Sequence, residues 1–172
     1  MQEIYVEKLK EVIRSKARLQ KELGIKLTNR GKNVFVNGSP QKEFTAIEVL
    51  EAINVGFSAD RALEVTRDNF MLQTINIKNV TKRHDLERVR GRIIGKDGRT
   101  LKTLQKLTNC DLAITDNEIG LIGPISEMED AIQSVTSLIQ GSKQGNVYGR
   151  LERRRKKKGA DDPELAIDLE KE

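Results

Sequence analysis

Between residues 72 and 108 the spacing of hydrophobic positions changes from that of a strand to that of two helices. Residues 72–77 predict a first strand, and residues 87–94 predict a short helix. A turn rich in glycine and charge follows at 95–98. The next helix carries one apolar stripe at helical spacing, formed by Thr100, Leu101, Leu104 and Leu107. The pattern therefore predicts two helices, joined by a tight turn, that pack on a sheet.

Two strands and one long helix complete this unit. Apolar side chains alternate along the first of these strands, at Cys110, Leu112 and Ile114. A polar turn at 116–117 leads to a second strand over 119–122, which Pro124 ends. Ser126 and Glu129 have the spacing of a capping box and predict the start of the helix. Its apolar face consists of Met128, Ala131, Ile132, Val135, Leu138 and Ile139.

The same pattern occurs 85 positions earlier in the chain. This shift places Leu19 on Leu104, Ile25 on Cys110, Leu27 on Leu112, Val34 on Ile119, Gly38 on Gly123, Ala46 on Ala131, Ile47 on Ile132, Leu50 on Val135 and Ile53 on Leu138. We therefore predict a first unit over residues 1–66, a second unit over 67–142 and a C-terminal extension over 143–172. The fold class expected is α+β, since 172 residues with 37% hydrophobic content suit two small cores.

The glycine turn differs between the two copies. Gly95 and Gly98 lack a β-carbon, so both can adopt positive φ and let another chain approach the backbone. Lys96 and Arg99 supply positive charge beside them. A G-x-x-G turn between helices resembles the signature loop of KH domains, which bind single-stranded nucleic acid. The shift of 85 leads from this turn to residues 10–13, which contain no glycine, so we expect the first unit not to bind RNA in the same way.

This loop predicts binding and positioning of RNA without chemistry. Bare backbone at the glycines would meet the phosphodiester strand, neighbouring cations would neutralise phosphates, and about four nucleotides would lie in the groove. Asp97 is expected to face solvent. The residues predicted to contact RNA in the second unit are Arg92, Ile94, Gly95, Lys96, Asp97, Gly98, Arg99 and Lys102.

The scarcity of aromatic residues helps to choose among nucleic-acid-binding modules. The chain has no Trp, two Tyr and four Phe, and residues 71–142 contain none of them. Modules that stack bases on exposed aromatic rings are therefore disfavoured. A KH groove has aliphatic walls, which we expect from Ile93, Ile94, Leu101 and Ile114. The competing interpretation is that these four side chains pack in the core, and it is favoured for Leu101 and Ile114.

Charge is distributed unevenly along the chain. The net charge is +5, but residues 159–172 carry six acids and one Lys, which leaves +10 on the rest. Nine cations and three acids lie within residues 82–106. A polyanion is therefore the expected partner. The acidic tail is interpreted as a disordered solubilising end, as a competitor that folds back on the basic surface, or as a short partner-binding helix near 165–169.

A second basic cluster covers residues 153–158, just before the acidic tail. Such a run is either a solvated helix face that begins near Glu152 or an RNA contact. We include Arg153, Arg154 and Arg155 among the predicted RNA-binding residues.

Other classes of function have weaker support. One cysteine and one histidine cannot form a Cys/His zinc site, so Cys110 is expected to be a small buried residue and His84 part of a solvated loop, with a weak RNA contact as the lesser alternative. No signal peptide or bilayer-spanning apolar run is visible, so we expect a soluble cytoplasmic protein. We also expect a monomer that binds no cofactor.

An enzyme is the main alternative from another class. The tempting motif is a P-loop at Gly91, Gly95 and Lys96, but three residues separate the glycines where a P-loop needs four. Asp97 also stands where Ser or Thr is required. We therefore expect no catalytic site and no metal site.

Three segments together resemble one family. They are GFSADRAL at 56–63, GRIIGKDGRT at 91–100 and GNVYGRLERRR at 145–155. Residues 56–158 are similar to the archaeal two-KH protein related to the eukaryotic small-subunit assembly factor called partner of Nob. The last segment is the most specific, because KH loops are common and that extension is not.

The resemblance implies two tandem type I KH domains, each a three-stranded antiparallel sheet packed on three helices in the order β-α-α-β-β-α. It also implies binding to the 3′ region of small-subunit (16S) rRNA or its precursor during ribosome assembly and rRNA processing. Relatives are linked to the Nob endonuclease and, in archaea, to the alpha subunit of initiation factor two. Family members commonly keep a glycine loop in the first unit, which this chain lacks. An alternative is a scaffold on which the first unit docks a nuclease or initiation factor while RNA binding is secondary.

Overall fold

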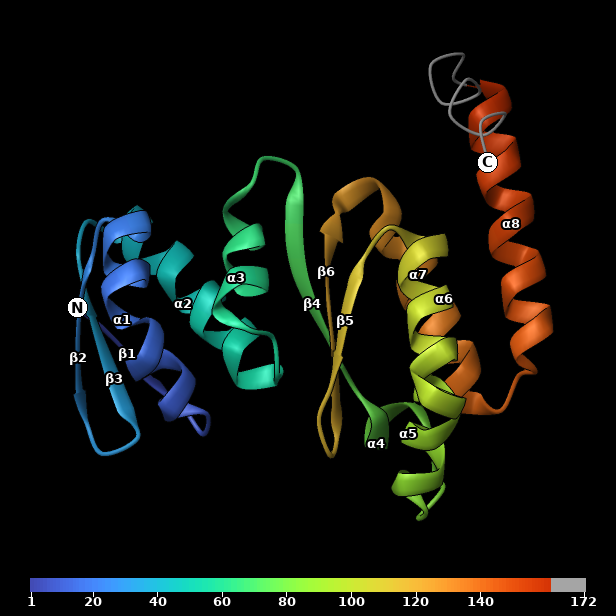
Figure 1. Ribbon diagram of the computed structural model, residues 1–172, viewed down its shortest axis with the longest axis horizontal. Helices are drawn as coiled ribbons and strands as arrows, with labels where there is room; N and C mark the ends of the chain where they lie inside the picture. The colour runs from blue at the N-terminus through green and yellow to red at the C-terminus, as the bar shows by residue number, and fades with distance from the viewer. Residues whose placement is uncertain (162–172) are drawn as a thin grey trace.

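The computed structural model describes residues 1–161 and contains two three-stranded antiparallel sheets with helices between and beside them (Figure 1). The first sheet and its helices comprise β1 (Gln2–Tyr5), α1 (Leu9–Leu23), β2 (Lys26–Arg30), β3 (Asn33–Asn37), α2 (Pro40–Val55), α3 (Ala59–Ala62) and the 3₁₀ turn η1 (Leu63–Thr66). The second comprises β4 (Phe70–Asn76), α4 (Ile77–Val80), α5 (Leu86–Ile94), the 3₁₀ turn η2 (Lys96–Gly98), α6 (Arg99–Thr108), β5 (Asp111–Ile114), β6 (Glu118–Pro124), α7 (Ile125–Gln140) and α8 (Gln144–Asp161). The α+β class is confirmed. Residues 162–172, most of the predicted acidic tail, lie outside the described residues.

Both sheets have the same strand order, β1-β3-β2 in the first and β4-β6-β5 in the second. Leu27 pairs with Val36, and Leu112 pairs with Leu121, so the registers of the two hairpins differ by the predicted 85 positions. A side-chain contact repeats with the same shift. Gln20 Oε1 accepts from the Leu27 amide at 2.8 Å, as Gln105 Oε1 does from the Leu112 amide at 3.0 Å. The internal repeat read from the sequence is therefore present in the backbone pairing.

The repeat breaks down in the segment between the first and second strands. In the first unit one uninterrupted helix, α1, covers this distance and ends at Gly24 in the left-handed conformation. In the second unit α4, α5, the turn η2 and α6 occupy the equivalent stretch. Residues 10–13, which match the glycine turn, lie within α1, with Val12 buried. Residues 10–13 therefore form part of a continuous helix and not a turn.

The two units pack against each other through the second sheet. Figure 1 shows α2 and α3 between the two sheets, so that the outer face of the second sheet is covered. The core of the first unit extends onto Ile122 of β6. A β-carbon added at Gly120 would lie 2.6 Å from Val55 Cγ1 and 2.8 Å from Phe57 Cε2. Only glycine at this position lets the end of α2 approach the strand so closely.

On its other face the second sheet holds α5, α6 and α7 over a separate core. Ile93 of α5, Leu104 of α6 and Leu138 of α7 are fully buried there. Burying a side chain of this size contributes about 1.5–3 kcal/mol, so a few such residues fix the two helices that flank the glycine turn. The turn itself therefore sits on a rigid support.

Two details of the predicted elements are wrong. The helix α7 begins at Ile125, whose amide donates to the Asn69 carbonyl, so Ser126 lies inside the first turn and forms no capping box. The basic cluster does not begin a helix near Glu152, because α8 already starts at Gln144. Among residues 1–161 no helix has both the length and the apolar character needed to cross a bilayer.

Candidate nucleic-acid interface

The glycine turn is built around Gly95, which ends α5. Its φ is +73°, and its amide donates to the Gly91 carbonyl at 2.8 Å. A β-carbon at this position would lie 2.1 Å from Thr100 Oγ1 and 2.6 Å from Thr100 Cβ. Gly95 is therefore required by the packing of α6 against the end of α5, as well as by its left-handed backbone.

Gly98 has a different role at the other end of the turn. Its φ is +71°, but no atom lies within 4 Å of an added β-carbon, so this side of the backbone faces open space. Asp97 is also left-handed, with φ +55°, and its side chain is exposed as predicted. The turn therefore presents uncovered main chain immediately before α6 begins at Arg99. A sugar-phosphate strand can approach such a surface closely.

The cations around the turn fall into two groups. Lys96, Arg99 and Lys102 are exposed, and within residues 1–161 none of them forms a salt bridge. Arg92 is different, because its guanidinium Nη2 donates to the Ser142 carbonyl at 2.8 Å and is half-buried. Three of the four predicted phosphate contacts are thus exposed next to the turn, while Arg92 joins α5 to the segment that follows α7.

One polar residue that the sequence analysis missed supports the turn from behind. Gln144, the first residue of α8, donates from Nε2 to the Arg92 carbonyl and to Thr100 Oγ1, each at 3.0 Å. The carbonyl lies in the last turn of α5, and Thr100 is the residue packed against Gly95. Gln144 therefore links both helices on the covered side of the loop. Gln144 stands immediately before the GNVYGRLERRR segment at 145–155, and this position was the only feature of the sequence that could have pointed to it.

The apolar residues near the turn divide between core and surface. Ile94 is 37% exposed and Gly91, one turn earlier on α5, has open space around it. Leu101 and Ile114 are half-buried and pack on the second core, which fits the favoured core interpretation. The predicted groove position of Ile93 is wrong, because its side chain is fully buried. Successive residues point about 100° apart around a helix, and here Ile93 points into the core while Ile94 points outward.

The turn between β5 and β6, residues 115–117, lies opposite α5. Arg90 of α5 donates from Nη1 to the Asp116 carbonyl at 2.6 Å. β5 is an edge strand of its sheet, since the strand order is β4-β6-β5. The uncovered turn continues directly into the outer face of α5, where Gly91 and Ile94 are exposed, and an extended, single-stranded polymer can lie along it.

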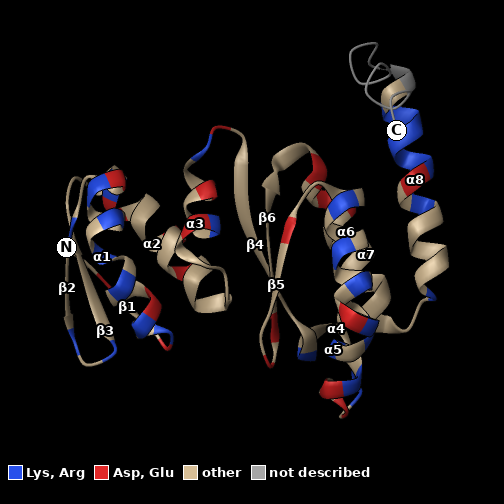
Figure 2. Ribbon diagram, in the orientation of Figure 1, with Lys and Arg blue, Asp and Glu red and all other residues tan. Residues whose placement is uncertain are grey.

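The second basic cluster lies farther along α8 (Figure 2). Arg154 pairs with the buried carboxylate of Asp130 on α7, and Lys158 pairs with both Asp130 and Glu127. Arg153 is exposed and Arg155 is half-buried. Ten residues of helix separate Gln144 from Arg154, a rise of about 15 Å. The structure therefore places the predicted α8 contacts apart from the glycine turn, and it neutralises one of them.

Neither Cys110 nor His84 gives a sign of chemistry. Cys110 is buried, and burial raises the pKa of its thiol to about 11, so the reactive thiolate is suppressed. His84 is exposed in the segment before α5. The expectations for both side chains are confirmed.

Comparison with known proteins supports the assignment of the fold and the loop. A family described as "Eukaryotic type KH-domain (KH-domain type I)", the second KH domain of PNO1, matches residues 71–156, which is half of the chain. The KH domain-containing protein MJ0443 of Methanocaldococcus jannaschii is 28% identical over 149 residues, covering 83% of this chain and 66% of that protein. The pre-rRNA-processing protein PNO1 of Debaryomyces hansenii is 35% identical over 123 residues, covering 70% of this chain and 47% of that protein.

The chain thus spans just under two thirds of the archaeal relative and about half of the yeast one. Among solved structures, a chain in the crystal structure of the a/eIF2alpha-aDim2p-rRNA complex from Pyrococcus horikoshii superimposes with a TM-score of 0.83 and 27% identity. The match covers 91% of this chain and 94% of that one. The family match contains the glycine turn, both helices that flank it and most of α8. The chain therefore belongs to the PNO1/Dim2-like family of type I KH-domain proteins.

Proposed function

We propose that this protein binds single-stranded RNA through the surface formed by α5, the turn Gly95–Gly98, α6 and β5, and that it acts in ribosome assembly. The observation that carries the proposal is the uncovered main chain at Gly98, flanked by the exposed cations Lys96 and Arg99. Backbone approach at a G-x-x-G loop is how KH domains hold about four nucleotides. The protein positions RNA and performs no reaction on it.

The RNA proposed is the 3′ region of small-subunit rRNA or its precursor. Support comes from the relatives, since PNO1 proteins are named for pre-rRNA processing and the Pyrococcus complex contains rRNA. Crosslinking to total cellular RNA and mapping of the bound fragments tests this directly. Enrichment at the small-subunit 3′ end is expected, and scattered sites in messenger RNA would favour a general RNA-binding role instead.

A double change, Lys96→Asp with Asp97→Gly, tests the loop itself. The first substitution reverses a charge beside the phosphate path, and the second places glycine where φ is already positive. RNA affinity should fall by about 100-fold, or ~2.7 kcal/mol, because repulsion replaces attraction at the closest contact. The thermal midpoint should stay within about 2 °C, since Asp97 occupies a conformation that glycine adopts without strain.

The matched control is Lys21→Gln in α1, which lowers the net charge by the same amount on an exposed helix of the first unit. It should leave RNA affinity within two-fold of the unchanged protein. If the loop variant binds as tightly as this control at equal salt, the turn is not the RNA site.

We also propose that the first unit, residues 1–66, is a degenerate KH domain. It has the strand order and the hairpin register of the second unit, which supports a common origin, and one helix, α1, in place of the helix-turn-helix. The proposed boundaries remain 1–66, 67–142 and 143–172.

Protein partners form the second candidate role. The Pyrococcus complex contains a/eIF2alpha beside aDim2p, which supports the alpha subunit of initiation factor two as a partner. The Nob endonuclease is proposed from the family resemblance, and the free protein is proposed to be a monomer. Affinity capture with the full chain after ribonuclease treatment tests the scaffold role. Retention of either protein without RNA would support it, and loss of both would leave RNA as the link between them.

A further inference from the structure

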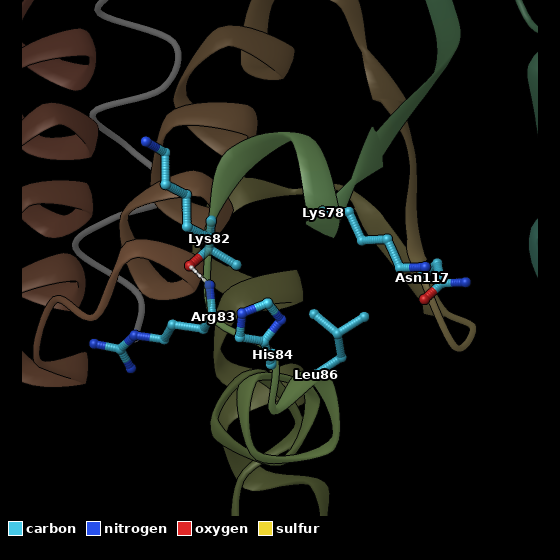
Figure 3. A pocket seen from close by; sticks show the side chains of 7 residues that line it. Lys78, Lys82, Arg83, His84, Leu86 and Asn117 are labelled. Atoms are coloured by element: carbon cyan, nitrogen blue, oxygen red, sulfur yellow. Dashed lines mark hydrogen bonds between the residues drawn. The ribbon is translucent and has the colours of Figure 1, made fainter.

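A second basic surface lies at the start of α5, outside the glycine turn. It is a pocket of about 620 Å³ between α4, the segment 81–85 and the β5–β6 turn. Figure 3 shows Lys78 extending from α4 toward Asn117, with His84 and Leu86 below them. The residues that line the pocket are Lys78, Thr81, Lys82, Arg83, His84, Leu86 and Asn117.

The pocket is held open by contacts among its own elements. The Ile77 amide donates to the Asn117 carbonyl at 2.8 Å, which fixes α4 to the β5–β6 turn. Asn76 Oδ1 accepts from the Lys78 amide at 3.0 Å and starts α4. Thr81 Oγ1 accepts from the Arg83 amide at 3.3 Å, which bends the segment back toward α5 (Figure 3). The cations are therefore carried on a preformed frame.

The charges in this pocket have one sign. Its lining contains three permanent cations and a histidine but no carboxylate. Within residues 1–161 none of Lys78, Lys82 and Arg83 forms a salt bridge. The acids that neighbour lining residues along the chain are Asp85, Glu87, Asp116 and Glu118, and none of them lines the pocket. Asp85 is engaged by the Arg88 amide and guanidinium. A lining that contains cations and no carboxylate attracts an anion that enters the pocket.

The pocket also lies on the path of a strand held by the glycine turn. Leu86 begins α5 and Gly95 follows its end, so the nine-residue helix separates them by about 13 Å. The β5–β6 turn lines the pocket through Asn117, and its Asp116 carbonyl accepts from Arg90 Nη1 in the middle of α5. An RNA strand that leaves the glycine turn and follows α5 toward Leu86 therefore comes to the pocket that Lys78 lines.

We propose that this pocket binds a phosphate of the same RNA strand, outside the nucleotides held by the glycine turn. The proposal rests on the proposed RNA-binding function and extends its footprint by one subsite. Lys78, which extends toward Asn117, supplies the charge next to the neutral hydrogen-bond donor of the Asn117 side chain (Figure 3). Lys82 lines the same pocket, but its side chain extends away from Lys78, so it adds positive charge at longer range. The pocket reads no base, so the gain in affinity is independent of the sequence of the added nucleotides.

The test compares RNA lengths. A four-nucleotide RNA from the 3′ end of 16S rRNA is extended by four uridines at its 5′ end or at its 3′ end, and binding is followed by fluorescence anisotropy. For the unchanged protein one of the two extensions should raise affinity about ten-fold. The Lys78→Gln, Lys82→Gln variant should lose this gain while binding the four-nucleotide RNA within two-fold of the unchanged protein.

The salt dependence of RNA binding gives a second test of the phosphate contact. Each phosphate neutralised on a single strand contributes about 0.7 to the slope of log K against log salt, so loss of this one phosphate contact should lower the slope for the extended RNA by about 0.7. The control is Lys10→Gln, Lys21→Gln, which removes two exposed lysines from α1. This control should keep both the length effect and the slope.

The results distinguish a failure of the proposed subsite from a failure of the proposed RNA-binding function. If the Lys78, Lys82 variant keeps the full gain from the extension, or loses the same factor on both lengths, the pocket is not a subsite for the strand. If free inorganic phosphate or an isolated nucleotide competes with the extension no better than chloride does, the strand is the ligand; strong competition by either would overturn the assignment to RNA. If the unchanged protein binds neither RNA, the proposed function itself fails.

Discussion

The two units have the same sheet, yet they differ in what each does with the segment between its first two strands. The first unit crosses this distance with the single helix α1, whereas the second breaks it into α5 and α6 around Gly95–Gly98. The hairpin registers still agree to the residue. A sheet therefore constrains its own pairing but leaves its covering helices free to change, because only their buried faces need to match the core. The proposed RNA-binding turn lies in the part of the unit that the sheet does not constrain.

The outer faces of the two sheets differ as well. Phe35 on β3 is half-buried, and Gly120, the residue 85 positions later, leaves room for Val55 and Phe57. The second sheet is thus enclosed between helices, while the first has helices on one face (Figure 1). The unit with the glycine turn is the one held on both sides. A site that relies on exposed main chain needs such support, since the loop itself buries little.

Gly95→Ala is expected to have the largest effect, because it changes the glycine turn that distinguishes the second unit from the first. The added β-carbon would collide with Thr100, and alanine would have to adopt the positive φ of Gly95. The junction between α5 and α6 must therefore open. The free energy of unfolding should fall by about 2–4 kcal/mol, and RNA affinity should fall by more than about 100-fold. Chemical denaturation and anisotropy measure the two effects.

Gly98→Ala is the matched control, because Gly98 also has a positive φ but no atom lies within 4 Å of an added β-carbon. It should cost about 1–2 kcal/mol of stability from the backbone alone. If both alanine variants behave alike, Gly95 is not the packing residue of the turn.

The contact between the units is tested by Gly120→Ala. The added carbon would overlap Val55 and Phe57, so stability should fall by about 1–3 kcal/mol while RNA affinity stays within two-fold. Thr74, which pairs with Gly120 and is exposed, provides the control. Thr74→Ala should change stability by less than about 0.5 kcal/mol. A large loss of RNA binding in the Gly120 variant would mean that the first unit holds the loop in place.

A smaller effect is expected from Gln144→Leu, which removes both hydrogen bonds behind the turn. We expect a loss of about 1 kcal/mol in stability and a three- to ten-fold loss in RNA affinity. The salt slope should not change, because no phosphate contact is removed. Gln140→Leu at the exposed end of α7 is the control. A drop in thermal midpoint with unchanged affinity would give Gln144 a structural role only.

The smallest expected effect concerns Glu43, which stands where the second unit has the buried Met128. The Gly38 amide donates to its carboxylate at 3.0 Å and lowers the pKa of Glu43 below the usual value of 4.5. A lowered carboxyl pKa stabilises the fold above about pH 4.5, and this stabilisation disappears as pH falls through the lowered pKa. Glu43→Gln should therefore be less stable than the unchanged protein at pH 7, with the difference narrowing at pH 4 and below. Urea midpoints at both pH values measure it, and a constant difference would contradict the assigned cause.

Much of the fold was accessible from the sequence because its signals are local. The alternation at Cys110 and Leu112 and the stripe through Leu104 mark a strand and a helix from neighbouring residues alone. The shift of 85 adds a second copy of the same evidence. Errors arose where one residue decides a boundary, as at Ser126, since the Asn69 carbonyl that fixes the start of α7 is distant in sequence.

The sequence by itself determined the repeat, the glycine turn and the missing turn in the first unit, because periodicity and glycine spacing are properties of short segments. Only the tertiary structure decided that Ile93 is buried while Ile94 is exposed, that Asp130 neutralises Arg154, and that Gln144 supports the loop. It also decided that Lys78 and Asn117 face one pocket. These relations join residues that are far apart along the chain or differ only in direction, and folding brings them together through packing that no local pattern encodes.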